Sequence, residues 1–261
     1  MMPIHQANIH HLWDRLHRFD ARQTSEALHW ALDELSVLLN AQVAGWCGIV
    51  RMHRHEPGNP MAGWRSAGFY STSQQNLMEQ VKMDQYRLME SLDPASTVGS
   101  AMSQAGTFRI GTLQAGVVSD DRYGSTYQSL LAKHGIVDGL YVTTPLSDDI
   151  ESWMSFHRMD PALPGFSSND IKLVETAVRP MAWFHQRVAT LYGLKVAESP
   201  LTPAERRVLE ALLSTETEQA IADQLGLTQS TVHTYCARLC RKLNVRGRSG
   251  LLGLWLNGQT H

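Results

Sequence analysis

A set of helix signals near the C-terminal end constrains this 261-residue chain more than any other segment. Thr202 precedes Pro203 and is followed three residues later by Glu205. This order supplies a capping hydroxyl, a proline suited to the first helical position and a carboxylate that returns to the cap. Apolar residues then recur at helical spacing, which predicts a helix that continues through Leu213.

Three more helices are predicted after the first. The second runs from about Glu218 to Leu225 and ends at the next residue, a glycine, because a residue without Cβ tolerates the turn there. Thr228 caps a third helix, roughly Gln229 to Leu243. The last apolar run, Leu251 to Leu256, predicts a fourth helix that closes the core. An all-α module is therefore expected over residues 201–261.

The third predicted helix separates into two faces when it is read at 3.6 residues per turn. The face expected to be buried consists of Val232, Tyr235, Cys236, Leu239 and Leu243. The opposite face is small and polar at its start and cationic behind, with Ser230, His233, Thr234, Ala237, Arg238 and Arg241. Such a helix fits a DNA major groove, where short side chains reach base edges and arginines meet phosphates. The alternative is a structural bundle with a solvated basic face.

Charge is unevenly distributed along this chain, whose formal net charge is only −2. From Leu201 onward there are seven Lys and Arg against five Asp and Glu, which gives +2 and leaves −4 upstream. No acidic residue follows Asp223, whereas five cationic residues lie close together: Arg238, Arg241, Lys242, Arg246 and Arg248. Coulomb attraction and counterion release would favour a polyanion at this cluster. The upstream region is not expected to bind DNA.

The same segment resembles the LuxR-type helix-turn-helix family of bacterial transcription regulators. The resemblance covers about Leu201 to Leu252 and rests on Leu-Thr-Pro-x-Glu, Ile-Ala-x-x-Leu-Gly-Leu-Thr, Thr-Val and Lys-Leu-Asn-Val, in family order and spacing. It implies that the residues facing bases are His233, Thr234 and Ala237. It implies that the residues holding phosphates are Ser230, Thr231, Arg238, Arg241 and Lys242. It also implies that the last helix contributes to a homodimer, which would read a pseudo-palindromic site in double-stranded DNA.

Three positions depart from the family pattern. Ala220 stands where a glutamate commonly precedes Ile-Ala, His233 where a lysine commonly follows Thr-Val, and Tyr235 where a histidine is common. We therefore expect a different affinity or a different operator. We also expect DNA binding to depend partly on pH, because histidine titrates near neutrality.

The upstream region is predicted to be a mixed helix-and-strand domain. Helical spacing extends from about His10 to Asn40 and from Gln74 to Leu92. The predicted strands are Val43–His53, Met61–Tyr70, Gly139–Leu146 and Ser152–Arg158, the last two joined by a turn at Ser147-Asp148-Asp149. A long helix begins near Ser167 and reaches about Leu191, with Pro180 kinking or interrupting it.

These elements predict an α+β chain. Residues 1–191 form an α/β/α sensor and dimerisation domain with an antiparallel sheet of the GAF/PAS kind, 192–200 form a linker, and 201–261 form the four-helix domain. Helices on both sides of a sheet leave room for a small molecule.

A thinner resemblance connects the upstream domain with acyl-homoserine-lactone receptors. Its motifs are Leu92-Asp93-Pro94, Thr107-Phe108-Arg109 and Gly135-Ile136-Val137-Asp138-Gly139. The resemblance implies that Asp93 accepts a ligand amide N–H; a turn aspartate before proline is the alternative. The family's tryptophan and tyrosine are not at their usual spacing, and Tyr86 is the nearest aromatic, so a different small molecule or none remains open. Trp64, Phe108 and Tyr141 are candidate pocket walls, with ordinary core packing as the alternative.

The sequence does not favour other classes of protein. Three cysteines do not make a disulfide framework, and Cys236, Cys240 and His233 are fewer ligands than structural zinc uses, so no metal or cofactor is expected. Nucleophile-elbow, phosphate-loop and His-Glu-x-x-His motifs are lacking, so an enzyme is not expected. With no signal peptide or membrane-length apolar run, we expect a cytoplasmic protein.

The leading hypothesis is a DNA-binding transcription regulator controlled by a small molecule bound upstream, with quorum sensing as one such role. The alternative is a regulator whose upstream domain binds no ligand and serves only dimerisation or protein interaction.

Overall fold

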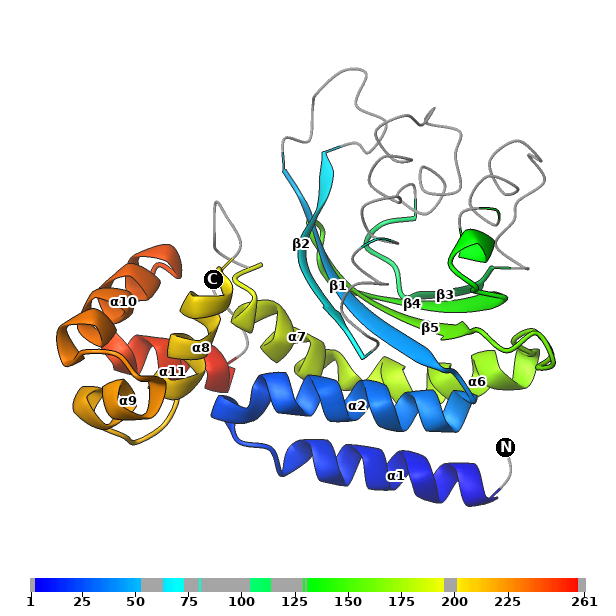
Figure 1. The fold of residues 1–261 in the computed structure, drawn as a ribbon, viewed down its shortest axis with the longest axis horizontal. Helices are drawn as coiled ribbons and strands as arrows, with labels where there is room; N and C mark the ends of the chain where they lie inside the picture. The colour runs from blue at the N-terminus through cyan, green and yellow to red at the C-terminus, as the bar shows by residue number, and fades with distance from the viewer. Residues whose placement is uncertain are drawn as a thin grey trace. The chain divides into compact units, whose positions relative to one another are not determined.

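The computed structural model describes residues 3–52, 63–72, 80, 104–113, 129, 131–194 and 201–257. The chain divides into two compact units, each with many contacts between its own residues (Figure 1). The first unit contains Met1–Leu12 and His29–Pro180, and the second contains Trp13–Leu28 and Met181–His261. The predicted helix at 74–92 lies outside the described residues apart from residue 80, as do Tyr86 and Asp93.

An antiparallel five-stranded sheet forms the first unit, in the order β2-β1-β5-β4-β3 (Figure 1). The strands are β1 (Val43–Arg51), β2 (Trp64–Ser71), β3 (Arg109–Thr112), β4 (Asp138–Ser147) and β5 (Ile150–Arg158). All four predicted strands are confirmed, as is the turn between β4 and β5. The sequence did not predict β3, because four residues are too few to establish an alternation.

The strand register sorts the side chains onto two faces, since residues directly opposite in an antiparallel pair share a face. Trp46, Met154 and Val142 lie opposite one another on one face and are almost fully buried. On this side, α6 (Ser168–Val178) packs against β3 and β4 (Figure 1). We call the other side the Glu151 face; it carries Cys47, Arg109, Tyr141, Thr143, Glu151, Trp153, Ser155 and His157.

The predicted helical region from His10 to Asn40 is two helices rather than one. These are α1 (Pro3–His17) and α2 (Thr24–Leu39), separated by the short 3-10 turn η1 (Ala21–Gln23). The Asp20 backbone N–H donates to Gln23 Oε1 at 3.1 Å, and Thr24 Oγ1 donates to the Ala21 carbonyl at 2.8 Å. Such local side-chain bonds compete with the helical ladder, which explains the break.

The predicted interruption at Pro180 is confirmed. Ser167 caps α6, and the 3-10 turn η2 (Arg179–Met181) then separates it from α7 (Ala182–Leu191). Proline lacks a backbone N–H and clashes with the preceding turn, so the helix cannot pass through it unchanged.

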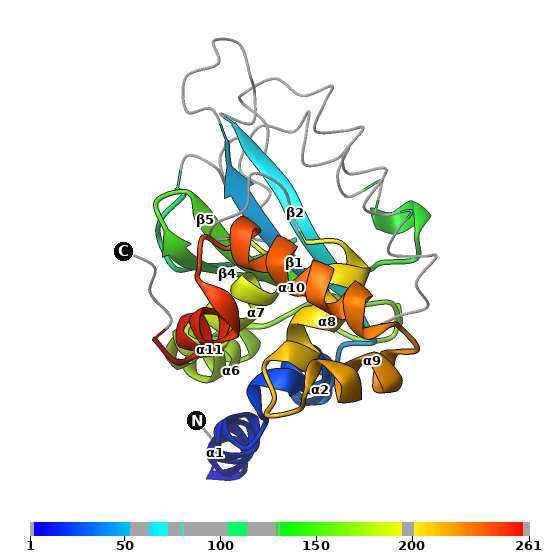
Figure 2. The ribbon, with the colours of Figure 1, turned by 90° about the vertical axis from the view of Figure 1, so that its left-hand side faces the viewer.

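The second unit contains the four predicted C-terminal helices, α8 (Pro203–Leu212), α9 (Glu218–Leu225), α10 (Gln229–Lys242) and α11 (Gly247–Asn257). The first three have the predicted bounds to within a residue, and α11 begins earlier than predicted. The α10 helix packs against the other three (Figure 2). Thr202 caps α8 as expected: its Oγ1 accepts from the Glu205 N–H at 3.2 Å, and its own N–H donates to Glu205 Oε2 at 2.9 Å. Gly226 ends α9 with φ of 66°.

The segment between α7 and α8 begins with buried residues. Tyr192 and Leu194 are buried, and the Tyr192 carbonyl accepts from the Leu201 N–H at 3.1 Å. A Cβ on Gly193, where φ is 76°, would lie 2.8 Å from Leu201 Cγ. The predicted 192–200 linker stays a prediction, because residues 195–200 lie outside the described ranges.

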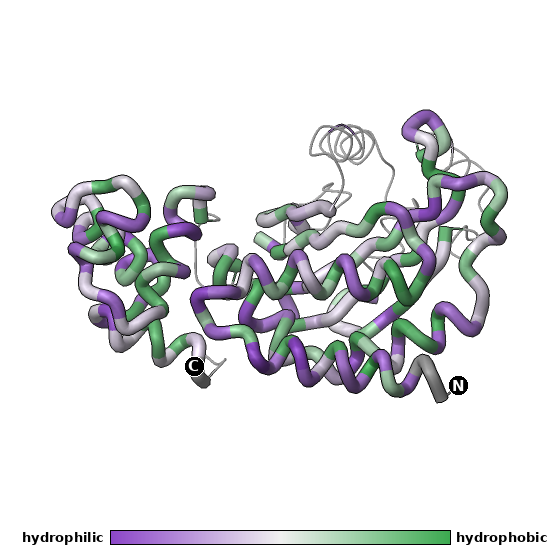
Figure 3. Tube along the Cα trace, turned by 60° about the horizontal axis from the view of Figure 1, so that its bottom comes forward, coloured by the Kyte–Doolittle hydropathy of each residue, from purple (hydrophilic) through white to green (hydrophobic). Residues whose placement is uncertain are grey.

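Hydrophilic and hydrophobic residues alternate along the helices of both units (Figure 3). In the described part of the chain, no helix combines the length and the hydropathy that crossing a membrane requires.

Candidate DNA interface and sheet face

The buried side of α10 is formed largely as predicted. Val232, Leu239 and Leu243 are almost inaccessible to solvent, and Cys236 is buried beside Cys240. Two details differ from the prediction, because Cys240 is part of this face and Tyr235 is only half-buried. The Arg238 guanidinium lies 5.5 Å from the centre of the Tyr235 ring, which places the ring at the edge of the core where a cation can stack on it.

The opposite side of α10 is open to solvent. Its exposed residues are Ser230, His233, Thr234, Ala237, Arg238 and Arg241, and Thr231 is half-buried. The predicted polar and cationic face therefore exists as one continuous surface of the helix. The roles assigned to its residues in contacting bases and phosphates remain predictions.

Hydroxyl groups gather at the start of α10. Thr228 Oγ1 accepts from the Thr231 N–H at 3.2 Å and lies 2.9 Å from Ser230 Oγ. Thr234 Oγ1 donates to the Ser230 carbonyl at 2.8 Å. The Thr234 hydroxyl proton is thus used within the helix, whereas its oxygen lone pairs and methyl group remain available. These groups can accept from a base amine or contact a thymine methyl.

His233 has a partner on the neighbouring helix. Its Nδ1 lies 3.2 Å from Glu218 Oε2 and 3.4 Å from Oε1. The His233 side chain is 73% exposed and that of Glu218 is 28% exposed. The imidazole therefore bridges α9 and α10 at the rim of the predicted reading surface.

Two of the five clustered cations are used within the fold. Lys242 Nζ lies 2.9 Å from both carboxylate oxygens of Glu205, which is buried. Burial opposes ionisation of this carboxyl, but hydrogen bonds from Thr202 together with the Lys242 ammonium outweigh it and lower the pKa of Glu205. The phosphate contact predicted for Lys242 would have to compete with this pair.

Arg248 is engaged even more fully. Its Nε donates to the Leu212 carbonyl at 2.7 Å, its Nη2 to the Ser214 carbonyl at 2.6 Å, and its Nη1 to the Glu216 carbonyl. These carbonyls lie at the end of α8 and in the turn that leads to α9. Arg248 therefore holds the helix-turn-helix geometry rather than presenting a free charge to solvent.

The candidate ligand residues are not brought together. Trp64 is buried and packs with Ile49 and Trp153, whereas Tyr141 stacks edge-on against His157, with ring centroids 5.7 Å apart. Phe108 has its ring 5.1 Å from the guanidinium of Arg179, the C-cap of α6.

Phe108 does not lie on the same side of the sheet as Trp64 and Tyr141, and the candidate role of each as a pocket wall stays a prediction. Arg109 pairs with Thr143 on the Glu151 face, and successive residues of a strand point to opposite sides. Phe108 accordingly faces the α6 side. Tyr86 and Asp93 lie outside the described residues, so their predicted roles are untested.

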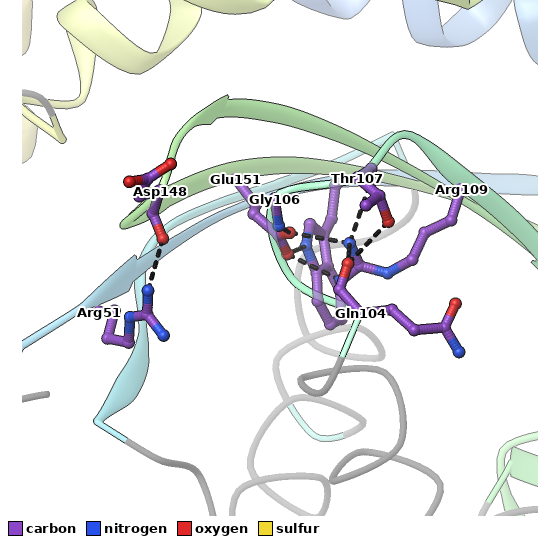
Figure 4. A network of polar contacts seen from close by, with 8 residues as sticks. Arg51, Gln104, Gly106, Thr107, Arg109, Asp148 and Glu151 are labelled. Atoms are coloured by element: carbon purple, nitrogen blue, oxygen red, sulfur yellow. Dashed lines mark hydrogen bonds and ion pairs between the residues drawn. The ribbon is translucent and has the colours of Figure 1, made fainter. Parts of the chain in front are cut away.

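A buried carboxylate, which the sequence reasoning missed, organises the Glu151 face (Figure 4). The Glu151 side chain is fully buried and receives two parallel 2.8 Å bonds from Arg109 Nη1 and Nη2. It also accepts from the Gly106 N–H at 3.0 Å and from Trp153 Nε1 at 2.8 Å. Its position carried no distinctive sequence signal, because Glu151 precedes the predicted strand at 152–158 and β5 contains other polar residues, such as Ser152 and Ser155. With every oxygen satisfied, Glu151 anchors residues 104–107 to the sheet.

An apolar hollow lies in the same unit. It has a volume of about 480 Å³ and is lined by Leu113, Ala132, Gly135, Ile136, Val137, Met159 and Pro161. Gly135, Ile136 and Val137 belong to the third motif of the resemblance to acyl-homoserine-lactone receptors, which carried no prediction of a cavity. Nearby, His157 is buried, and burial lowers its pKa to about 4, so it is neutral at physiological pH.

Metal ligands are not clustered in the described residues: no group of three His, Cys, Asp or Glu is placed to hold an ion there. Burial and the neighbouring Cys240 raise the pKa of the Cys236 thiol to about 11. This thiol is therefore protonated and unreactive at neutral pH.

Comparison with known proteins agrees with the geometry of the second unit. Residues 199–254 match the family described as bacterial regulatory proteins, luxR family. The chain therefore carries a LuxR-family helix-turn-helix domain at its C-terminal end, and this class of domain binds DNA and is not enzymatic. The resemblance predicted over 201–252 is confirmed.

A curated relative is similar to part of the chain. The transcriptional regulatory protein MctR of Rhizobium johnstonii is 32% identical over 85 residues, which are 31% of this chain and 40% of that protein. The chain thus matches about two fifths of the length of this curated relative.

Solved structures show low similarity over longer spans. SdiA in complex with octanoyl-rac-glycerol is 13% identical with a TM-score of 0.49, over 100% of this chain and 99% of that one. The N-acylhomoserine lactone dependent LuxR family transcription factor CepR2 from Burkholderia cenocepacia is 12% identical with a TM-score of 0.46, over 72% of this chain and 94% of that one.

Proposed function

We propose that this LuxR-family regulator binds double-stranded DNA by placing α10 in the major groove, and that a small molecule bound by the upstream domain controls that binding. The observation that carries the proposal is the exposed face of α10, polar at its start and cationic behind. The organisation into a sensor at 1–191, a linker at 192–200 and the DNA-binding domain at 201–261 belongs to the same proposal, as does a cytoplasmic location.

The proposed effector site is the apolar hollow beside Ile136 and Met159; Tyr141 of the Glu151 face packs against the same apolar cluster. An apolar wall with few polar groups suits a small amphipathic molecule. The effector must favour either the DNA-competent or the DNA-incompetent state, since equal affinity for both would shift nothing.

The proposed active form is a homodimer joined through α11. Leu251 and Trp255 pack inward, whereas Leu252 and Leu254 are half-exposed on the same helix. Two copies related by a two-fold axis would present two α10 helices to half-sites about one helical turn apart.

Two measurements on the full chain test these statements. Selection from a library of duplexes with a random core should enrich a two-fold symmetric site; no enrichment, with or without added cell extract, would contradict DNA recognition. Thermal unfolding with acyl-homoserine lactones, an octanoylglycerol or cell extract tests the effector, since ligand at 100 times its Kd adds about 2.7 kcal/mol. An unfolding temperature that none of the three changes would favour an upstream domain that binds no ligand and serves dimerisation or protein interaction.

A further inference from the structure

The contact between Glu218 and His233 determines which atom the imidazole can offer to DNA. A carboxylate only accepts hydrogen bonds, so the ring nitrogen that faces it has to carry a hydrogen. Nδ1 is the nitrogen that lies 3.2 Å from Glu218 Oε2. The Nδ1–H form is therefore favoured when the ring is neutral, and Nε2 then holds a lone pair.

Nε2 is positioned to reach beyond the protein. The His233 side chain is 73% exposed and stands on the same open face of α10 as Thr234 and Ala237. Nδ1 is occupied by Glu218, so Nε2 is the ring atom left to meet a base edge.

Among the described residues, Glu218 is the ionic partner of the His233 ring, and other charged groups on α9, α10 and α11 have partners of their own. On α9, Asp223 is engaged by Gln219 at 2.8 Å. On α10, the nearest cation along the exposed face, Arg238, stacks on Tyr235. On α11, Arg248 is bound to the three carbonyls described above.

We propose that Glu218 and His233 act together as a base-selecting pair whose preference changes with protonation. This inference rests on the proposed function, since it assumes that the exposed face of α10 reads DNA. With a neutral ring, the Nε2 lone pair accepts from an amino group, N6 of adenine or N4 of cytosine. With a cationic ring, Nε2–H donates instead to a keto oxygen, O6 of guanine or O4 of thymine.

The experiment is selection from a random duplex library by the purified full chain at about pH 8 and about pH 6, which bracket the range where histidine changes charge. One position of the enriched site should favour amino bases at the higher pH and keto bases at the lower. A preference of about 3- to 10-fold is expected, the value of one net hydrogen bond.

Three variants sharpen this test. His233→Lys carries a permanent donor, so it should select keto bases at both pH values. Glu218→Gln should lose the preference for amino bases, because an amide can donate to Nδ1 as well as accept from it. Glu216→Gln removes the same charge two residues away, on an exposed residue, and should behave like the wild type. An enriched site that is identical at both pH values and in all variants would overturn the base-selecting pair while leaving DNA recognition intact. No enrichment by the wild type would instead overturn the proposed function, and the pair with it.

A second measurement needs no DNA. Long-range ¹H–¹⁵N correlation on the full chain labelled at histidine, with the His233 signals assigned by their loss in His233→Lys, reports the tautomer directly. The wild type should show the Nδ1–H form above neutral pH, and Glu218→Gln should shift toward the Nε2–H form that free imidazole prefers. An Nε2–H ring in the wild type would overturn the proposal whether or not a DNA site has been found.

Discussion

Replacing Arg248 with alanine should destabilise the second unit without removing a phosphate contact. The guanidinium makes charge-assisted bonds to the carbonyls of Leu212, Ser214 and Glu216. Such bonds contribute about 1.5 kcal/mol each at the lower end of their range. The carbonyl of the exposed Glu216 can regain a water molecule, so we count the other two bonds and expect a loss of about 3 kcal/mol.

Urea unfolding of the full chain, followed by tryptophan fluorescence, measures this loss. Arg248→Lys should lose most of the same stability, because an ammonium keeps the charge but lacks the planar fork. Arg246→Ala is the matched control: it removes an equal charge from an exposed neighbour and should change stability by no more than about 0.5 kcal/mol.

The salt dependence of DNA binding separates this structural role from a direct contact. Below the unfolding transition, Arg248→Ala should leave the slope of log K against log salt unchanged, whereas losing one phosphate contact lowers it by about 0.9. Unchanged stability together with a reduced slope would refute the reasoning and place Arg248 on the DNA.

Three further predictions use the same preparations. Arg238→Ala should weaken DNA binding across all sequences and reduce the salt slope by about 0.9, whereas Thr234→Val should mainly alter base preference. If both variants bound DNA as the wild type does in a gel-shift titration, the reading face would be wrongly assigned. Glu151→Gln should cost about 3–5 kcal/mol in urea unfolding, because it removes the charge from one half of a buried ion pair, and a loss below about 1 kcal/mol would mean that the pair is hydrated. Burial lowers the pKa values of His157 and His185 to about 4. The free energy of unfolding should therefore be highest above pH 6.5 and should fall as the pH falls toward 4, by at most about 3 kcal/mol for each histidine. A free energy of unfolding that stays constant over this range would show that the two histidines are not buried in the neutral form.

The C-terminal helices were predictable because their signals are local. The cap at Thr202 and the partner at Glu205 are three residues apart, and Gly226 stops α9 through its own backbone conformation. The β4–β5 hairpin and the break at Pro180 were predictable for the same reason. The polar face of α10 also followed from the sequence, since the helical period alone decides which residues share a side.

What each charge does was decided only by the tertiary structure. In the sequence, nothing distinguished the roles of Lys242 and Arg248 from that of the exposed Arg241. In the structure, Lys242 pairs with Glu205, 37 residues away along the chain, and Arg248 binds the end of α8, 36 residues away. The same holds for Glu151, whose partner Arg109 comes from a strand too short to predict. Side chains in a strand alternate with a period of two, so an error of one residue in register moves each of them to the other face. The sequence therefore determined which residues belong to each helix and hairpin, whereas pairing across distant segments determined which side chains are buried, paired or left open to a ligand.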